Sequence, residues 1–336
     1  MSIGQRLKRL GIDTYLALLL GTILLATVLP VSGAAADVVR VVSLAGVALL
    51  FFLYGAKLDT STVIAGIANW RVQLLVLVIT FIAFPLLALA MTTGLAPWLD
   101  PNIVIGLLFV GALPSTVQSS VAFTALARGN VAAAVCAASI SNLLGVVLTP
   151  LLCAVLLHSS GTINPAAVGA VALQILLPFV LGQIARRWIG GWVSRNRMLT
   201  LTVDRGSILL IVYSAFSAGM VSGVWAQVAG TTLALTPGCV AVLFVVIAVG
   251  AVWIGRLVGL PPADRMTLLF CGSTKSLASG VPMASILFAG QPISLIILPL
   301  MLFHQLQLIV CAIIAQRRAA LSDDGDGGTA PAPVAA

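Results

Sequence analysis

The sequence contains no glutamate, and it has only nine acidic residues, all aspartates, and two histidines among 336 residues. A common general acid and base is therefore missing, and neither GxSxG, HExxH nor paired aspartates within an apolar run occur. The five cysteines have no CxxC spacing, which argues against a disulfide framework or a zinc site. We therefore expect a protein that is not an enzyme and that holds no organic cofactor.

Charge of either sign is also scarce. Only 8% of the residues are charged and 60% are hydrophobic, and the mean hydropathy is +1.17. Soluble globular proteins carry roughly 25% charged residues, so this composition predicts a protein embedded in membrane lipid. The net charge of +8 is spread over short segments without a basic face, which argues against nucleic acid as a partner.

Ten apolar runs are each long enough to cross a bilayer, which takes about 20 residues. Because lipid offers no partner for unpaired backbone groups, they predict an all-α polytopic membrane protein. The first run follows Arg6, Lys8 and Arg9 and also fits a cleavable signal peptide, which would leave nine spans. The runs lie near 12–31, 38–56, 72–95, 103–127, 131–157, 165–186, 203–223, 233–255, 266–289 and 292–315.

The basic residues predict the orientation of these helices. With the N-terminus in the cytoplasm, 15 of the 17 Lys and Arg residues fall in cytoplasmic segments; Arg40 lies outside and Lys275 within the membrane. We expect a multi-pass protein of the plasma membrane, in bacteria the inner membrane, with both termini cytoplasmic. Residues 321–336 are rich in Asp, Gly, Pro and Ala and are predicted to form a disordered cytoplasmic tail.

The two halves of the chain resemble each other. At an offset of 161 positions, Leu107-Leu-Phe109 falls on Leu268-Leu-Phe270, and Gly111 falls on Gly272. Each half has five spans, and an odd number inverts the second half relative to the first. We therefore expect two inverted repeats, 1–157 and 158–320, whose partner helices are the fourth and the ninth.

These two partner helices are expected to be discontinuous. Pro114 interrupts the fourth, and Gly272 and Gly280-Val-Pro282 are expected to interrupt the ninth. Ser139 and Asn142 of the fifth span share a helix face. The alternative is that such residues only hold helices together; we favour a wet binding cavity for a substrate or an ion. The candidate binding residues are Pro114, Ser115, Thr116, Gln118, Ser119, Ser120, Ser139, Asn142, Ser273, Thr274, Lys275, Ser276 and His304.

Two of these candidates are ionisable. Lys275 lies deep in an apolar run, and no span provides an acid at comparable depth; such a lysine costs at least about 2.5–3.5 kcal/mol and requires a partner. The partner is backbone carbonyls, hydroxyls or an anionic substrate, unless the side chain extends to the membrane surface. His304 is either a hydrogen-bonded packing residue or part of a proton relay.

Several segments resemble the bile acid:sodium symporter family, solute carrier family 10 and its bacterial relatives. They are 111–120, 126–131 and 148–152, and the segment 270–282 is similar to the branch containing the member 7 type. The resemblance implies a core of spans 3–5 and 8–10, with helices 4 and 9 crossing, and a panel of spans 1, 2, 6 and 7. It also implies a sodium ion as coupling ion at Ser119, Ser120, Ser139 and Asn142.

The departures from the family pattern concern sodium. Ser120 replaces the asparagine of the family's Ser-Asn pair, the acid expected within 270–275 is missing, and Thr80 stands where the family has a glutamine. Lys275 lies near the expected second sodium site, and its charge would repel the ion. We expect Lys275 either to replace a coupling cation or to pair with an anionic substrate.

Two functions remain. The first is a secondary transporter that moves a small organic anion by alternating access, coupled to sodium or to protons. The alternative is a non-transporting membrane regulator of ion homeostasis or envelope biogenesis, with a cation site locked by Lys275. The oligomeric state does not follow from the sequence.

Overall fold

The computed structural model describes residues 14–57, 69–158 and 165–326, and every regular element in these ranges is helical. The positive N-terminal residues Arg6, Lys8 and Arg9, and residues 327–336 of the predicted tail, lie outside the described residues. The elements are α2 (Thr14–Val28), α3 (Gly33–Lys57), α5 (Trp70–Val78), η2 (Ile79–Ala83), α6 (Phe84–Leu95), η3 (Ala96–Trp98), α7 (Pro101–Ala112), α8 (Gln118–Leu126), α9 (Val131–His158), α10 (Pro165–Arg195), α11 (Arg197–Ser222), α12 (Val224–Gln227), α13 (Gly230–Leu257), α14 (Pro262–Ser273), α15 (Leu277–Leu287) and α16 (Ile293–Asp326).

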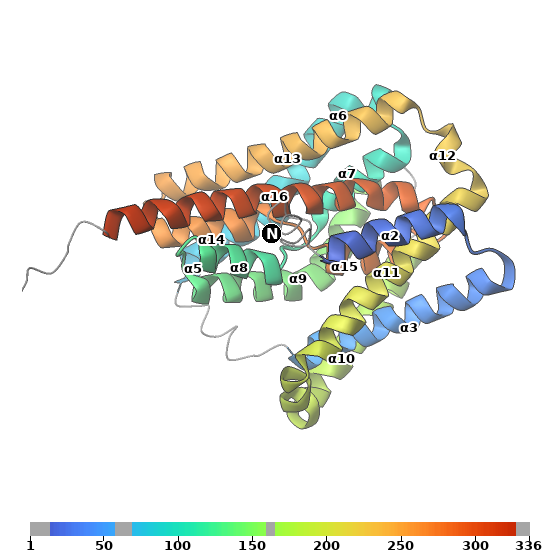
Figure 1. Ribbon diagram of the computed structural model, residues 1–336, viewed down its shortest axis with the longest axis horizontal. Coiled ribbons are helices and arrows are strands. Elements are labelled where there is room, and N and C mark those ends of the chain that lie inside the picture. Colours follow the sequence, from blue (N-terminus) through green and yellow to red (C-terminus); the bar gives the residue numbers. More distant parts are fainter. Residues whose placement is uncertain (1–13, 58–68, 159–164, 327–336) are drawn as a thin grey trace, which may run out of the picture.

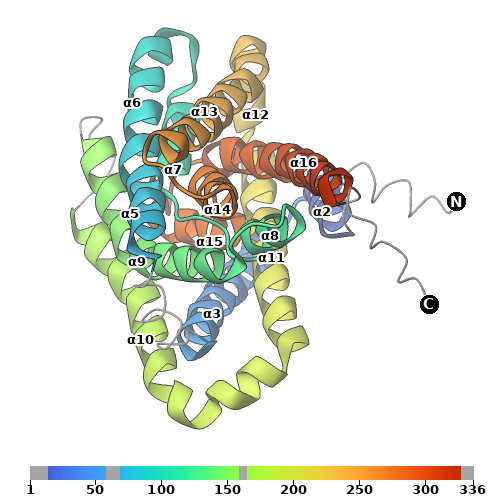
Figure 2. The same cartoon turned by 90° about the vertical axis from the view of Figure 1, so that its left-hand side faces the viewer.

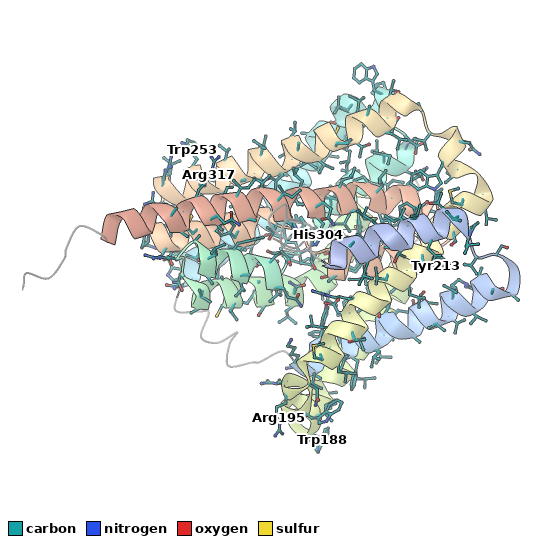
Figure 3. The ribbon with its side chains drawn as sticks, viewed as in Figure 1. Trp188, Arg195, Tyr213, Trp253, His304 and Arg317 are labelled. Carbon is teal, nitrogen blue, oxygen red and sulfur yellow. The ribbon has the colours of Figure 1, made fainter. Side chains whose placement is uncertain are left out.

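Within the described ranges, six stretches of helix are long and apolar enough to cross a membrane. Large apolar side chains on the outer surface are exposed, among them Val155, Val249 and Trp253, and Figure 3 shows Trp253 pointing away from the helix bundle. Such a surface is stable against lipid and unfavourable in water. The expected all-α membrane protein is thus confirmed at the level of helical content and long apolar spans. The stretches are 33–57, 70–98, 131–157, 198–222, 230–257 and 293–320.

Several boundaries differ from those expected from the sequence, and three of these differences bear on the argument below. Helix α11 begins at Arg197, before the apolar run at 203–223. Helix α16 continues through 321–326, the expected beginning of the disordered tail, because extending a helix is easier than starting one. Pro282, expected to interrupt its helix, lies inside α15, and the interruption lies before this helix at Thr274–Ser276.

Helices α3 and α10 cross in direct backbone contact. A Cβ placed on Gly55 would lie 2.0 Å from the carbonyl oxygen of Phe179, and one placed on Gly182 would lie 2.0 Å from that of Phe52. Small residues allow two membrane helices to approach this closely. Helix α11 packs against α3 and α2, so α2, α3, α10 and α11 form one group, at the lower right of Figure 1.

The remaining helices surround the two interrupted ones. Helix α7 packs against α16, α6 and α9, and α14 packs against α13, α8 and α5. Figure 2, viewed along the bundle, places α14, α15 and α8 in the middle, with α5, α9, α13 and α16 around them. Residues 113–116 and 274–276, which interrupt the helices, are buried, as irregular backbone at membrane depth must be.

Candidate functional site

The first interruption separates α7 from α8 at Leu113–Val117. Leu113 is extended, with φ −73° and ψ 152°, and Pro114 has no N–H to continue the helix. Side chains of α9 bind the released groups: Thr149 Oγ1 donates to the Ala112 carbonyl at 2.9 Å, and Ser141 Oγ accepts from the Ser115 N–H at 3.0 Å. The predicted break at Pro114 is confirmed.

The second interruption, between α14 and α15, is tied to the first. Thr274 is extended, and Ser276 caps α15 by accepting from the Ser279 N–H at 3.2 Å. The Ser276 N–H donates to the Pro114 carbonyl at 3.0 Å, and Ser115 Oγ lies 3.2 Å from Thr274 Oγ1. Segments about 160 positions apart along the chain thus share hydrogen bonds at one point in space.

The ammonium group of Lys275 lies at this junction and has no exposed surface. It donates to the carbonyls of Thr80, Gly111 and Leu113 at 3.0, 2.9 and 2.6 Å. It also lies 4.1 Å from the centre of the Phe84 ring, a favourable cation–π position. An ammonium has three N–H donors, and all three are used here. Lys275 therefore does not extend to the membrane surface.

Local backbone geometry explains why these carbonyls accept a lysine. In η2, a π-helical turn, the Phe84 N–H donates to the Ile79 carbonyl; the next residue, Pro85, has no N–H, so the Thr80 carbonyl loses its helical partners. The other two carbonyls, of Gly111 and Leu113, lie at and beyond the end of α7, where the helix no longer supplies donors. We call the three carbonyls of Thr80, Gly111 and Leu113 the carbonyl cage.

Two amide side chains extend this hydrogen-bonded junction. Asn142 Nδ2 donates to the Ser115 carbonyl at 2.6 Å, and Asn142 Oδ1 lies 3.0 Å from Ser279 Oγ, so Asn142 contacts both interrupted helices. Gln307 binds the backbone of Lys275, and its Nε2 lies 2.9 Å from His304 Nδ1. His304 is half-buried and faces the interior of the molecule, as Figure 3 shows.

A cavity of about 640 Å³ adjoins the junction. Its apolar wall includes Phe51, Phe123, Phe179, Ile208 and Met283, and its volume is within the range of small-molecule sites. The predicted binding residues that line it are Thr116, Gln118, Ser119, Ser139, Asn142, Ser276 and His304.

The other predicted residues lie behind this lining. Pro114 and Ser115 form the first interruption, and the hydroxyls of Ser273 and Thr274 donate to carbonyls of their own helix, those of Leu269 and Phe270. Lys275 is fully buried, and its three donors are bound within the protein. These residues form the junction and are not part of the cavity lining.

Of the four residues implied as sodium ligands, three line the cavity and the fourth, Ser120, does not. Ser119, Ser139 and Asn142 line the cavity. Ser120 is buried, and its hydroxyl donates to the Thr116 carbonyl and to the Val117 carbonyl at 3.3 Å. Asn142 Oδ1 already contacts Ser279. At the carbonyl cage, three backbone oxygens bind the ammonium of Lys275.

Sequence reasoning missed Asp204. This residue is 8% exposed, lines the cavity, and accepts a hydrogen bond from the Tyr54 hydroxyl at 3.1 Å. Asp204 is the second residue of the apolar run at 203–223, where the polar end of a span is expected. The helix begins seven residues before Asp204, at Arg197, so the carboxylate is about two turns inside α11. The sequence did contain a signal, because two charged residues, Asp204 and Arg205, stand at the start of a predicted span.

Comparison with known proteins supports a transport role for this geometry. The model of the SBF-like CPA transporter family matches residues 13–320. A Pseudomonas aeruginosa protein named Uncharacterized protein PA2026 is 51% identical over 324 residues, 96% of this chain and 97% of that protein. The Escherichia coli K12 protein named Putative symporter YfeH is 44% identical over 307 residues, 91% of this chain and 92% of that protein.

A more distant relative comes from an animal. The Rattus norvegicus protein named Sodium/bile acid cotransporter 7 is 30% identical over 288 residues, 81% of this chain and 82% of that protein. The resemblance expected from 111–120 and 270–282 is confirmed, including its member 7 type. The matched family and the relatives named for an activity are transporters, in agreement with the expectation that the chain is not an enzyme.

Proposed function

The chain belongs to the SBF-like CPA transporter family, and we propose that it is a secondary transporter that moves a small organic anion by alternating access. The solute binds in the 640 Å³ cavity, and the ammonium of Lys275 replaces a coupling cation. The observation that carries this proposal is the carbonyl cage, in which all three donors of Lys275 are bound where two interrupted helices meet. Interrupted helices at membrane depth are typical of transporter binding sites.

The charges of the cavity support an anionic solute. Its basic residues are Lys57 and Arg205, and Asp204 is the acidic residue of its lining in the described part of the chain. An anion gains from the two positive charges when water is excluded. Lys275 itself, with its donors bound, is not the group that pairs with the solute.

The proposed architecture is ten spans in two inverted repeats, 1–157 and 158–320. In its favour, α7 and α14 begin at Pro101 and Pro262 and end at Ala112 and Ser273, an offset of 161 residues at both ends. The proposed core is spans 3–5 and 8–10, with the crossing helices, and the panel is spans 1, 2, 6 and 7, the group of α2, α3, α10 and α11. The protein lies in the bacterial inner membrane, with both termini on the cytoplasmic side.

The thermal stability of the purified protein tests the role of Lys275. Wild type, Lys275→Ala and the control Lys57→Ala are melted in sodium and potassium chloride at equal ionic strength. We expect wild type and the control to melt alike in both salts. Lys275→Ala melts lower and regains stability in sodium, by about 2.7 kcal/mol at a hundredfold excess over its dissociation constant. A sodium response that wild type has and Lys275→Ala lacks would instead make Lys275 the support of an ordinary ion site.

The filled cage also favours a second candidate, a non-transporting regulator of ion homeostasis or envelope biogenesis, since a permanently bound cation can lock the junction of the two interrupted helices. A cysteine introduced in the cavity, Ser139→Cys, separates the two. The five native cysteines are buried, which limits their background reaction. Alkylation from both faces of the membrane is expected of a transporter, and alkylation from one face under all conditions is expected of a locked regulator.

A further inference from the structure

Asp204 is a buried carboxylate inside a helix that is long and apolar enough to span the membrane. Its hydrogen-bond partner is the hydroxyl of Tyr54 on α3. An ionisable residue at such a position is expensive to keep and is expected to have a function. The function proposed above assigns it none.

Asp204 lies between two hollows. The cavity of about 640 Å³ is one, and the other, of about 260 Å³, extends past Thr200 and Leu201 toward the beginning of α11. Asp204, Tyr54 and Lys57 line both hollows. Among the described residues that line either hollow, Asp204 is the one acidic side chain. The carboxylate of Asp204 is therefore within reach of a proton from either hollow.

The groups facing Asp204 come from all sides. Helix α3 presents Tyr54 and Lys57, α11 itself presents Arg205, and α16 contributes His304 on the same cavity. From α9 and the start of α8, the shared lining is neutral, namely Val117, Gln118 and Val135. Asp204 and Tyr54 lie on the α2, α3, α10 and α11 group, and the neutral residues lie beside the interrupted helices.

We propose that Asp204 is the exchangeable proton site of this protein, and that its protonation is coupled to binding of the anionic solute. The inference rests on the proposed transport function. Lys275 is covalently part of the chain, so the cation in the carbonyl cage cannot be exchanged across the membrane. An exchangeable ion then needs another group, and the carboxylate provides it: a hydronium ion of the aqueous phase gives its proton to the carboxylate, which becomes a carboxylic acid, and water is left.

Electrostatics gives the coupling its direction. A negative Asp204 repels an anion in the same cavity, and protonation removes that repulsion while the positive charges of Lys57 and Arg205 stay. The solute and the proton then bind together, and the pair carries less net charge than the anion alone. Asparagine at this position keeps the acceptor for Tyr54 but carries no charge and takes up no proton.

Infrared spectroscopy of the reconstituted protein tests the proton site directly. With no glutamate and nine aspartates in the chain, the C=O stretch of protonated carboxyl groups has few contributors. Wild type, Asp204→Asn and the control Asp264→Asn are titrated with acid. Asp264 pairs with Asn130 at 2.8 Å and lines neither hollow. We expect one carboxyl band that wild type and Asp264→Asn share and that Asp204→Asn lacks; an unchanged band set in Asp204→Asn would overturn the proposal.

The coupling is tested with the Ser139→Cys reporter, whose alkylation from each face is measured across the same pH range. We expect the ratio of the two rates to change severalfold with pH in the reporter alone and to stay constant when Asp204→Asn is added. If the cysteine is alkylated from both faces but the ratio of the two rates does not change with pH, or changes equally in both variants, the coupling is wrong and the transport function stands. One-sided alkylation throughout would overturn the transport function and the coupling, while the infrared band would still decide whether Asp204 binds a proton.

Discussion

Gln307 holds the peptide backbone of Lys275 from both sides: its Oε1 accepts from the Lys275 N–H at 2.7 Å, and its Nε2 donates to the Lys275 carbonyl at 2.9 Å. Both residues are fully buried. A single side chain of α16 thus replaces the two hydrogen bonds that the interruption between α14 and α15 removes. The position of the ammonium in the carbonyl cage depends on this contact, because the side chain is anchored at the backbone that Gln307 binds.

Gln307→Leu is expected to lower the melting temperature strongly. The substitution leaves two buried backbone groups of Lys275 unpaired, at about 1–3 kcal/mol each. Gln305→Leu, on the same helix and half-buried, is the control and is expected to change little. Gln307→Glu keeps an acceptor for the N–H and should fall between the two. Equal melting of the two leucine variants, measured by thermal unfolding in detergent, would contradict the role of Gln307.

Phe84→Leu is expected to destabilise the protein by about 0.5–2 kcal/mol more than its lost packing, because the ring faces the buried ammonium of Lys275 at 4.1 Å. Phe303→Leu is a matched control, since the two rings contact each other edge to face at 5.8 Å. The excess cost should vanish when Phe84→Leu is made in a Lys275→Met background. A cost that is the same with and without the lysine would show that Phe84 acts by packing alone.

Asn142 and Ser279 are expected to be energetically coupled across the junction. Their side chains meet at 3.0 Å, and Asn142 also binds the Ser115 carbonyl. A double-mutant cycle of Asn142→Ala and Ser279→Ala should give a coupling of about 0.5–1.5 kcal/mol in unfolding free energy. Thr149→Ala, which removes the contact with the Ala112 carbonyl, serves as an uncoupled partner. Additive effects of Asn142→Ala and Ser279→Ala would rule out a direct interaction.

Gly182→Ala is expected to destabilise the contact between α3 and α10. Its Cβ would lie 2.0 Å from the Phe52 carbonyl oxygen, and the backbone of a helix cannot move as a side chain can. Gly238→Ala on α13 meets nothing within 4 Å and should be neutral or slightly stabilising, by up to about 1 kcal/mol from helix propensity. The two melting temperatures should therefore move apart, and a similar response in both would contradict the close crossing.

The sequence predicted a structural feature correctly where the chemistry of one residue type is enough to cause that feature. Pro114 lacks an N–H, and the helix ends before it; Lys275 requires partners at membrane depth, and the structure gives it three. The sequence did not predict which carbonyls accept from Lys275, because the Thr80 carbonyl is left without a helical donor only by a π-helical turn followed by Pro85. Pro282 did not interrupt its helix, because α15 begins only five residues before it and the interruption is held by hydrogen bonds from elsewhere in the chain.

Asp204 shows a different limit of sequence reasoning. Hydropathy locates the apolar part of a span, and α11 extends beyond that part into polar residues. A charged side chain in such an extension is buried or exposed depending on what packs against it. Here Tyr54 of α3 packs against it, a contact between residues 150 positions apart that no local pattern contains.

The carbonyl cage has its cation attached to the chain by four methylene groups. An ammonium that belongs to the chain cannot diffuse away, and its three donors are bound by carbonyls of the protein. Under the proposed function, the sodium gradient therefore does no work at the carbonyl cage.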